Sequence, residues 1–280
     1  MPLIKLIADS GATKTEWCVI NGNKKTIFIT QGMSPYFITA EQMQNIIKEE
    51  LHPKLKQKID EVHYYGTGCA NADNAKSVKK VFKNIFPEAN ISIDHDLMAA
   101  AKALCGKEKG IACILGSGSN SCYYDGKKII KNSPGLGFIL GDEGSGAYLG
   151  KKVIQYYLYN TFDEDLMARF DARFETNKTE ILNAVYKKPL PNRYLATFAI
   201  FLAENRGHYM IENIIEDGLN DFFFNHVYKY KESWMLPVHF VGSIAYGFKD
   251  VLIELCKSYQ LQLGKVIKNP MQGLIDYHKQ

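Results

Sequence analysis

The chain carries one short device twice, and this repetition restricts the possible fold more than any other feature. In residues 4–23, an apolar strand, the turn Ser10-Gly11-Ala12-Thr13-Lys14, a second strand and an Asn-Gly hairpin turn follow one another. In residues 111–126, an apolar run ends in Gly116-Ser117-Gly118-Ser119-Asn120, and a second extended segment leads to Asp125-Gly126. A period of about a hundred residues is too long for a solenoid and predicts a duplicated domain.

Turns of this composition are suited to binding an anion. Their glycines let backbone N–H groups approach and point at one place, and Ser117 and Ser119 add hydroxyl donors. One such turn would equally fit an ordinary hairpin. Two of them, facing each other across a cleft, would hold a nucleoside triphosphate from both sides, and this pairing is the main functional prediction.

Composition excludes several other classes of protein. The 280 residues suffice for one large or two moderate domains, and 46% apolar with 23% charged residues is typical of a soluble globular protein. A net charge of +4 with scattered lysines argues against nucleic-acid binding, and no apolar run approaches the ~20 residues of a membrane span. The first residues lead directly into a strand without the layout of a signal peptide.

Six dispersed cysteines without a C-x-x-C pair indicate buried thiols in a reducing cytoplasm and argue against a zinc or iron–sulfur site. We therefore expect a cytoplasmic protein that binds a small molecule.

Both copies continue as α/β segments. The first adds a third strand at 26–30, a helix that begins at Thr39, a strand at 62–66, an amphipathic helix at 74–86, a strand at 91–93 and a helix at 97–104. The second begins at Lys109 and adds a five-glycine loop at 134–146, broken helices over 147–224, a core strand at 237–241, a helix at 247–259, a short strand at 266–267 and a terminal helix from about Leu274. The order βββαβα predicts an N-terminal lobe, 1–106, and a larger C-terminal lobe, 107–280, whose terminal helix can pack back on the first lobe.

Four motifs in this order resemble the N-acetylglucosamine kinase-like branch of the BadF/BadG/BcrA/BcrD ATPases. They are Asp9–Thr15, Asp96 at a strand end, Gly116–Asn120 and Gly141–Ser145. The family belongs to the actin, sugar kinase and Hsp70 ATPase superfamily. The resemblance implies a two-lobed α/β actin-like fold of duplicated ribonuclease H-like domains, with ATP and Mg²⁺ in the interdomain cleft and an amino sugar as substrate. It also implies a homodimer.

The resemblance assigns the nucleotide to both turns. Asp9 would hold the Mg²⁺ ion, directly or through water. Phosphate contacts would come from two loops: Gly11, Ala12, Thr13 and Lys14, and then Gly116, Ser117 and Gly118. Gly242 and Ser243 would lie at the adenosine end.

The resemblance makes Asp96 the general base. The residues implied to line the sugar site are Ser34, Ser119, Asn120, Gly135, Leu136, Gly137 and Asp142. At position 34 the family usually has an Asn, and the shorter Ser lacks the paired donor and acceptor of an amide.

Structural roles compete with these assignments. Asp9 could simply cap its turn, and Asp96 stands where an N-cap would stand, before Leu97. His95 fits a packed or surface position better than a catalytic one. Asp142 and Glu143 are adjacent, which argues against the separated carboxylates of a glycosidase, and we interpret Glu143 as structural.

Three functions compete on the same scaffold. The first is a kinase acting on an N-acetylated amino sugar, with the 6-hydroxyl of N-acetylglucosamine as the preferred acceptor. The second is an ATPase that activates a reductase or dehydratase through an iron–sulfur cluster shared between two subunits. Cys105 lies near the lobe junction, but the sequence shows no second, glycine-flanked cysteine to form the pair that such a cluster needs. The third is a non-catalytic sugar or nucleotide sensor, which Ser34 makes plausible.

Overall fold

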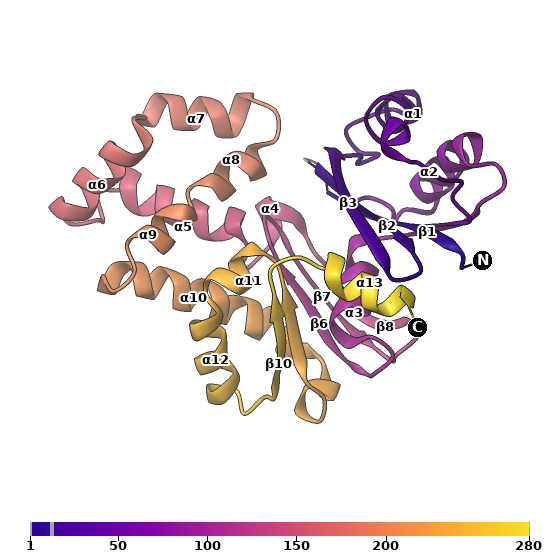
Figure 1. Ribbon diagram of the computed structural model, residues 1–280. Helices are drawn as coiled ribbons and strands as arrows, with labels where there is room; N and C mark the ends of the chain where they lie inside the picture. The colour runs from indigo at the N-terminus through magenta and orange to yellow at the C-terminus, as the bar shows by residue number, and fades with distance from the viewer. Residues whose placement is uncertain (1, 12–13, 280) are drawn as a thin grey trace. The chain divides into compact units, whose positions relative to one another are not determined.

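The computed structural model describes residues 2–11 and 14–279. Their contacts divide the chain into two compact units, the first reaching to Lys107 and resuming at Pro270, the second spanning Glu108–Asn269. Each unit contains a mixed five-stranded sheet. Figure 1 shows the elements of both.

The sheet of the first unit has the strand order β3-β2-β1-β4-β5. Its strands are β1 (Ile4–Ser10), β2 (Lys14–Asn21), β3 (Lys24–Gln31), β4 (Glu61–Gly66) and β5 (Asn90–Asp94). β1 to β3 form an antiparallel meander, whereas β1, β4 and β5 run parallel. The carboxyl ends of β1, β4 and β5 therefore meet at one edge of the sheet.

The helices of the first unit begin and end with recognisable signals. They are α1 (Ala40–Ile46), the π-helical η1 (Ile47–Leu51), the short 3-10 helix η2 (His52–Lys54), α2 (Ala72–Ile85), α3 (Asp96–Cys105) and α13 (Met271–Lys279). Thr39 and Gln42 form a reciprocal capping box at α1, which confirms the predicted helix start. Val78, Val81 and Phe82 are the buried face of α2, as its periodicity predicts.

The terminal helix α13 packs within the first unit, against α3, β1 and β2 (Figure 1). A side chain at Gly273 would meet the carbonyl oxygen of Ala103 at 2.4 Å, so this glycine allows the two helices to approach closely. His278 is buried, its Nε2 lies 2.8 Å from the Tyr65 hydroxyl, and its ring stacks on His63 at 3.9 Å. Lys5 Nζ donates to the carbonyl of His278 at 2.8 Å.

This docking is expected to make stability depend on pH. Burial, and then the neighbouring His63, Lys102 and Lys5, lower the pKa of His278 to about 3. An unfolded histidine titrates near pH ~6.5, so the unfolded chain binds more protons below that pH. The stability that neutral His278 contributes above pH ~6.5 is therefore lost as pH falls towards the folded value, by about 2 kcal/mol at pH ~5.

Urea unfolding at pH ~6.5 and pH ~5 tests this expectation. Asp9 acts in the opposite direction, because burial and nearby carboxylates raise its pKa to about 7. The informative quantity is consequently the difference in pH dependence between the natural chain and His278→Gln, which should be flatter. The exposed His52, changed to Gln, serves as the control, and an unchanged slope in His278→Gln would contradict the expectation.

The second unit repeats the topology of the first. Its sheet has the order β10-β9-β6-β7-β8, formed by β6 (Gly110–Leu115), β7 (Ser119–Tyr124), β8 (Ile129–Ser133), β9 (Val238–Val241) and β10 (Leu263–Ile267). β6 to β8 are antiparallel, and β6, β9 and β10 are parallel. When β6 is matched with β1, every strand has a counterpart of the same direction, as a duplicated domain requires.

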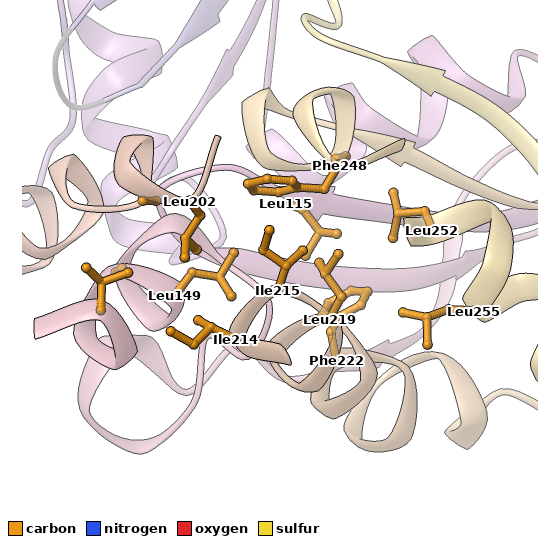
Figure 2. Packing of buried hydrophobic residues seen from close by; sticks show 14 of the residues in the cluster. Leu115, Leu149, Leu202, Ile214, Ile215, Leu219, Phe222, Phe248, Leu252 and Leu255 are labelled. Carbon is orange, nitrogen blue, oxygen red and sulfur yellow. The ribbon is translucent and has the colours of Figure 1, made fainter. Parts of the chain in front are cut away.

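The second unit also contains most of the helices of the chain's described residues. They are α4 (Gly137–Leu140), α5 (Gly146–Leu158), α6 (Glu164–Phe174), α7 (Lys178–Lys187), α8 (Pro191–Thr197), α9 (Ile200–Glu204), α10 (Tyr209–Asn225), the 3-10 helices η3 (Val227–Lys229) and η4 (Lys231–Trp234), α11 (Ser243–Gly247) and α12 (Lys249–Ser258). Figure 2 shows Leu115, at the end of β6, among Phe248, Ile215 and Leu219. This core anchors the end of β6, from which the second predicted phosphate turn projects.

All six cysteines are buried, as predicted. Within residues 2–11 and 14–279, no helix is both long and apolar enough to cross a membrane.

Candidate active site

Two aspartates meet at the carboxyl edge of the first sheet. The strand register pairs Asp9 with Tyr65 and Tyr65 with Asp94, so the ends of β1, β4 and β5 are level. Asp9 is the next-to-last residue of β1, and Asp96 begins α3 directly after β5. Burial, and then the negative charges of Asp96 and Glu16, raise the pKa of Asp9 to about 7. Asp9 and Asp96 are therefore close enough to interact electrostatically.

The carboxylate of Asp96 is held at both oxygens. Thr67 donates its hydroxyl to Oδ2 at 3.0 Å, and the backbone N–H of Leu97 donates to Oδ1 at 2.9 Å. Asp96 is the first residue of α3, and the N-cap position belongs to His95. The alternative interpretation of Asp96 as the N-cap is thus wrong, because α3 begins one residue earlier than the sequence suggested.

The first glycine turn is closed by a hydrogen bond from the N–H of Gly11 to the carbonyl of Lys14, at 3.0 Å. Ala12 and Thr13 lie outside the described residues. The Ser10 hydroxyl is buried, 2.8 Å from Thr15 Oγ1, and it accepts the N–H of Met33 at 3.2 Å. Ser10 therefore ties the end of β1 to β2 and to the loop after β3, which is a structural role.

Ser34 follows directly in that loop. Its side chain is buried, and its hydroxyl has no hydrogen-bond partner in the part of the chain that the structure describes. The bond from Met33 to Ser10 places Ser34 beside the first turn. Buried hydroxyls are normally paired, so a donor or acceptor from outside the protein would complete the site.

The second glycine turn lies over the beginning of α5. Its N–H at Gly116 donates to the carbonyl of Gly118 at 3.0 Å. The carbonyls of Gly116 and Ser117 in turn accept the N–H groups of Gly146 and Ala147, at 2.8 and 3.1 Å. Those bonds fix the turn, and the partial positive charge of a helix N-terminus stands behind it, which favours an anion there.

Gly242 lies against the same turn. A side chain at this position would meet the Leu115 carbonyl oxygen at 2.1 Å and the Gly116 nitrogen at 3.0 Å, and its φ is +131°. Ser243 follows as the exposed first residue of α11. The structure thus brings Gly242 together with Gly116. That both contact the nucleotide stays a prediction.

Residues predicted to bind the sugar gather beside the second turn. The N–H of Ser119 donates to Asp142 Oδ1 at 3.4 Å, and a side chain at Gly118 would lie 3.1 Å from Asp142 Oδ2. A side chain at Gly135 would lie 3.1 Å from the Ser119 carbonyl oxygen. Burial raises the pKa of Asp142, and the Ser119 N–H opposes that shift.

The remaining predicted sugar residues have different surroundings. The side-chain oxygen of Asn120 accepts from Asn132 Nδ2 at 2.8 Å and from the Ser121 N–H at 2.9 Å. Leu136 and Gly137 are exposed at the start of α4. The Ser119 hydroxyl is buried and, among the described residues, lacks a hydrogen-bond partner. Ser119 therefore resembles Ser34 in having a buried hydroxyl that a ligand could satisfy.

Glu143 contacts a buried histidine rather than Asp142. Its Oε2 lies 3.1 Å from Nε2 of His226, whose ring stacks on Phe222 at 4.8 Å. The pair fixes the loop that carries Asp142 to the end of α10. The interpretation of Glu143 as structural fits this contact.

Comparison with known proteins identifies the chain. Residues 8–209 match the model of the BadF/BadG/BcrA/BcrD ATPase family. The chain belongs to this family. Membership of this ATPase family implies that the chain binds ATP.

Solved structures of putative N-acetylglucosamine kinases resemble this ATPase. The one from Porphyromonas gingivalis is 39% identical, with a TM-score of 0.93 and 98% of each chain covered. The one from Chromobacterium violaceum is 15% identical, with a TM-score of 0.77 over 100% of this chain and 99% of the other. A relative by sequence, the N-acetylmuramic acid/N-acetylglucosamine kinase of Clostridium acetobutylicum, is 24% identical over 77% of this chain and 75% of its own length. The fold is the predicted actin-like ATPase fold of sugar kinases.

Thr67 is the residue of this BadF/BadG-type ATPase that sequence reasoning missed. It stands in the loop after β4, and its contact with Asp96 joins residues that are far apart along the chain. The available signal was its place at the carboxyl end of a parallel strand, where ligand-binding residues of α/β sheets gather.

Proposed function

We propose that this ATPase is a kinase that transfers the γ-phosphoryl group of ATP to a hydroxyl of an N-acetylated amino sugar. The 6-hydroxyl of N-acetylglucosamine is the preferred acceptor. The observation that carries the proposal is the convergence of Asp9 and Asp96 at one sheet edge, with Asp96 held at both oxygens. Family membership and the 39% identity to the P. gingivalis protein support it.

The two glycine turns supply the phosphate contacts in this proposal. Gly11 and Lys14, with Ala12 and Thr13, belong to the first turn, and Gly116, Ser117 and Gly118 form the second. Gly242 and Ser243 would contact the adenosine end of the nucleotide. Gly242 leaves room for the backbone at Leu115–Gly116, so its small size shapes this part of the site.

The surroundings of Asp9 suit Mg²⁺. No group of three or more His, Cys, Asp or Glu side chains within the described ranges could hold a metal ion. Magnesium bound with a nucleotide needs only one or two carboxylates, because phosphate oxygens and water complete its shell. The negative charges of Asp96 and Glu16 act on Asp9, and a divalent cation would offset this excess of negative charge. Bound there through Asp9, the ion would neutralise phosphate charge.

Asp96 is the proposed general base. Its carboxylate accepts the proton of the sugar hydroxyl while the hydroxyl oxygen bonds to the γ-phosphorus. The bond between that phosphorus and the bridging oxygen of ADP breaks, and the sugar phosphate and ADP result. Because such transfers need little covalent chemistry from the protein, positioning of the sugar supplies much of the rate.

The sugar contacts in this proposal begin with two serines and an aspartate. Ser34 and Ser119 contribute hydroxyls that are buried and, in the described chain, unpaired, and Asp142 contributes a carboxylate. The backbone of Gly135, Leu136 and Gly137 and the amide of Asn120 complete the predicted contacts.

A coupled assay of ADP release over a panel of sugars tests the proposed function. We expect N-acetylglucosamine to stimulate ADP release most, followed by other N-acetylated amino sugars, with glucose and water far slower. Mass spectrometry of the product should show one added phosphoryl group. Sugar binding without turnover would instead support the sensor function, and a coloured, oxygen-sensitive protein would support the reductase activator.

A further inference from the structure

Thr67 is held by hydrogen bonds of both its backbone and its side chain. It follows the last residue of β4, and its backbone N–H donates to the carbonyl of Ser10, at the end of β1, at 3.0 Å. Its side chain is half-buried, and its hydroxyl donates to Asp96 Oδ2 at 3.0 Å. One residue thus joins the ends of β1 and β4 to the start of α3.

The loop on both sides of Thr67 has little freedom. A side chain at Gly66 would meet the Tyr64 ring at 2.5 Å. Gly68 has a φ of +92°, and a side chain there would meet the Tyr36 ring at 3.0 Å. The carbonyl of Gly68 accepts from Asn74 Nδ2 at 3.1 Å. The Thr67 hydroxyl is therefore a preorganised donor.

This donor has a chemical consequence for Asp96. With Oδ1 bound by the Leu97 N–H and Oδ2 by Thr67, the plane of the carboxylate is determined by two bonds. A neutral hydroxyl orients the carboxylate without adding a positive charge that would weaken it as a base. Proton transfer depends on such alignment, because a small misplacement of a reacting group slows the reaction strongly.

We propose that Thr67 is a positioning residue that orients the Asp96 carboxylate for proton abstraction, an inference that rests on the proposed kinase function. Thr67 acts through Asp96. Its loss removes alignment and leaves substrate binding intact.

Steady-state kinetics of Thr67→Val and Thr67→Ser test this role. Valine keeps the shape of threonine without the hydroxyl, so kcat should fall about ten- to a hundredfold, with both KM values within about twofold. Serine restores the donor and should retain kcat within about threefold. Adding Thr67→Val to Asp96→Asn should lower kcat no further than Asp96→Asn alone, because Thr67 acts only through the Asp96 carboxylate. Thr176→Val removes a Thr–carboxylate bond of 3.1 Å on the surface, to Glu180, and is the matched control.

Several results would overturn the inference. They are full kcat in Thr67→Val, a loss confined to KM, or a Thr67→Ser variant as slow as Thr67→Val. If the natural protein phosphorylates no sugar, the proposed function fails, and crystal structures then decide the inference by themselves. The Asp96 carboxylate should rotate away from the Leu97 N–H in Thr67→Val and keep its orientation in Thr67→Ser, and an unmoved carboxylate in Thr67→Val would refute it.

Discussion

Asp96→Asn is expected to lower kcat for sugar phosphorylation by about 10²- to 10⁴-fold, the usual contribution of a general base. The amide has nearly the volume of the carboxylate, and its oxygen can still accept from Thr67, so the local structure should persist. What disappears is a group able to take the proton of the sugar hydroxyl. Coupled ADP release gives kcat, and calorimetry gives the affinity for ATP, which should change by less than about threefold.

Asp73→Asn provides the control for this experiment. Asp73 is an exposed residue in the first turn of α2, so the same chemical change there should leave kcat unaltered. Near-normal turnover in Asp96→Asn would refute the assignment of the base. A collapse of ATP affinity would show that the substitution had damaged the site as a whole.

Gly242→Ala is expected to destabilise the second unit by about 3 kcal/mol or more, because overpacking and a positive φ act together. The new methyl group would lie 2.1 Å from the Leu115 carbonyl oxygen, and backbone cannot move aside as a flexible side chain can. Any relief must displace the end of β6 or the start of α11. Because Gly116 follows Leu115, we also expect a marked loss of ATP affinity in the fraction that folds.

Gly247→Ala separates this effect from the general consequences of losing a glycine. Gly247 ends α11, and a side chain there would meet nothing within 4 Å. Alanine is the better helix former by up to ~1 kcal/mol, so Gly247→Ala should be neutral or stabilising. Urea unfolding of the two variants gives the comparison, and equal midpoints would contradict the packing argument.

The succession of most strands along the chain could be predicted because apolar runs and Gly-bearing turns define it locally. The Asp125-Gly126 turn is present, with Asp125 Oδ1 accepting two backbone N–H groups at 2.8 Å. The strand that follows, β8, was not predicted. It is an edge strand whose middle residues are exposed, so it lacks the alternation by which a half-buried strand is recognised.

The starts of two elements were misplaced for related reasons. α13 begins at Met271 rather than near Leu274. The Asn269-Pro270 pair indicates a loop, because the residue before a proline is disfavoured in a helix, and the first turn of α13 follows it directly. α3 includes Asp96, because a His can occupy the N-cap position without the side-chain bond that makes a cap recognisable.

Some features of the candidate site are encoded in short motifs, and others depend on contacts between residues far apart in the sequence. Glycine turns and their neighbouring aspartates are visible in short motifs, although their roles stay predictions. The bond from Thr67 to Asp96 and the approach of Gly242 to Leu115 depend on which strands become neighbours. No spacing along the chain encodes those contacts, since they follow from parallel pairing of β4 with β5 and of β6 with β9.

Because α13 belongs to the first unit while residues 108–269 form the second, the chain leaves the first unit and returns to it at the end. On the ribosome, β1 to β5 emerge long before the helix that covers Ala103 and pairs His278 with Tyr65. The surface of the first unit that α13 covers therefore stays uncovered until residues 108–269 have been synthesised. Completion of the first unit therefore depends on synthesis of the second. A nascent chain that stops before Pro270 lacks the helix that packs against α3, β1 and β2.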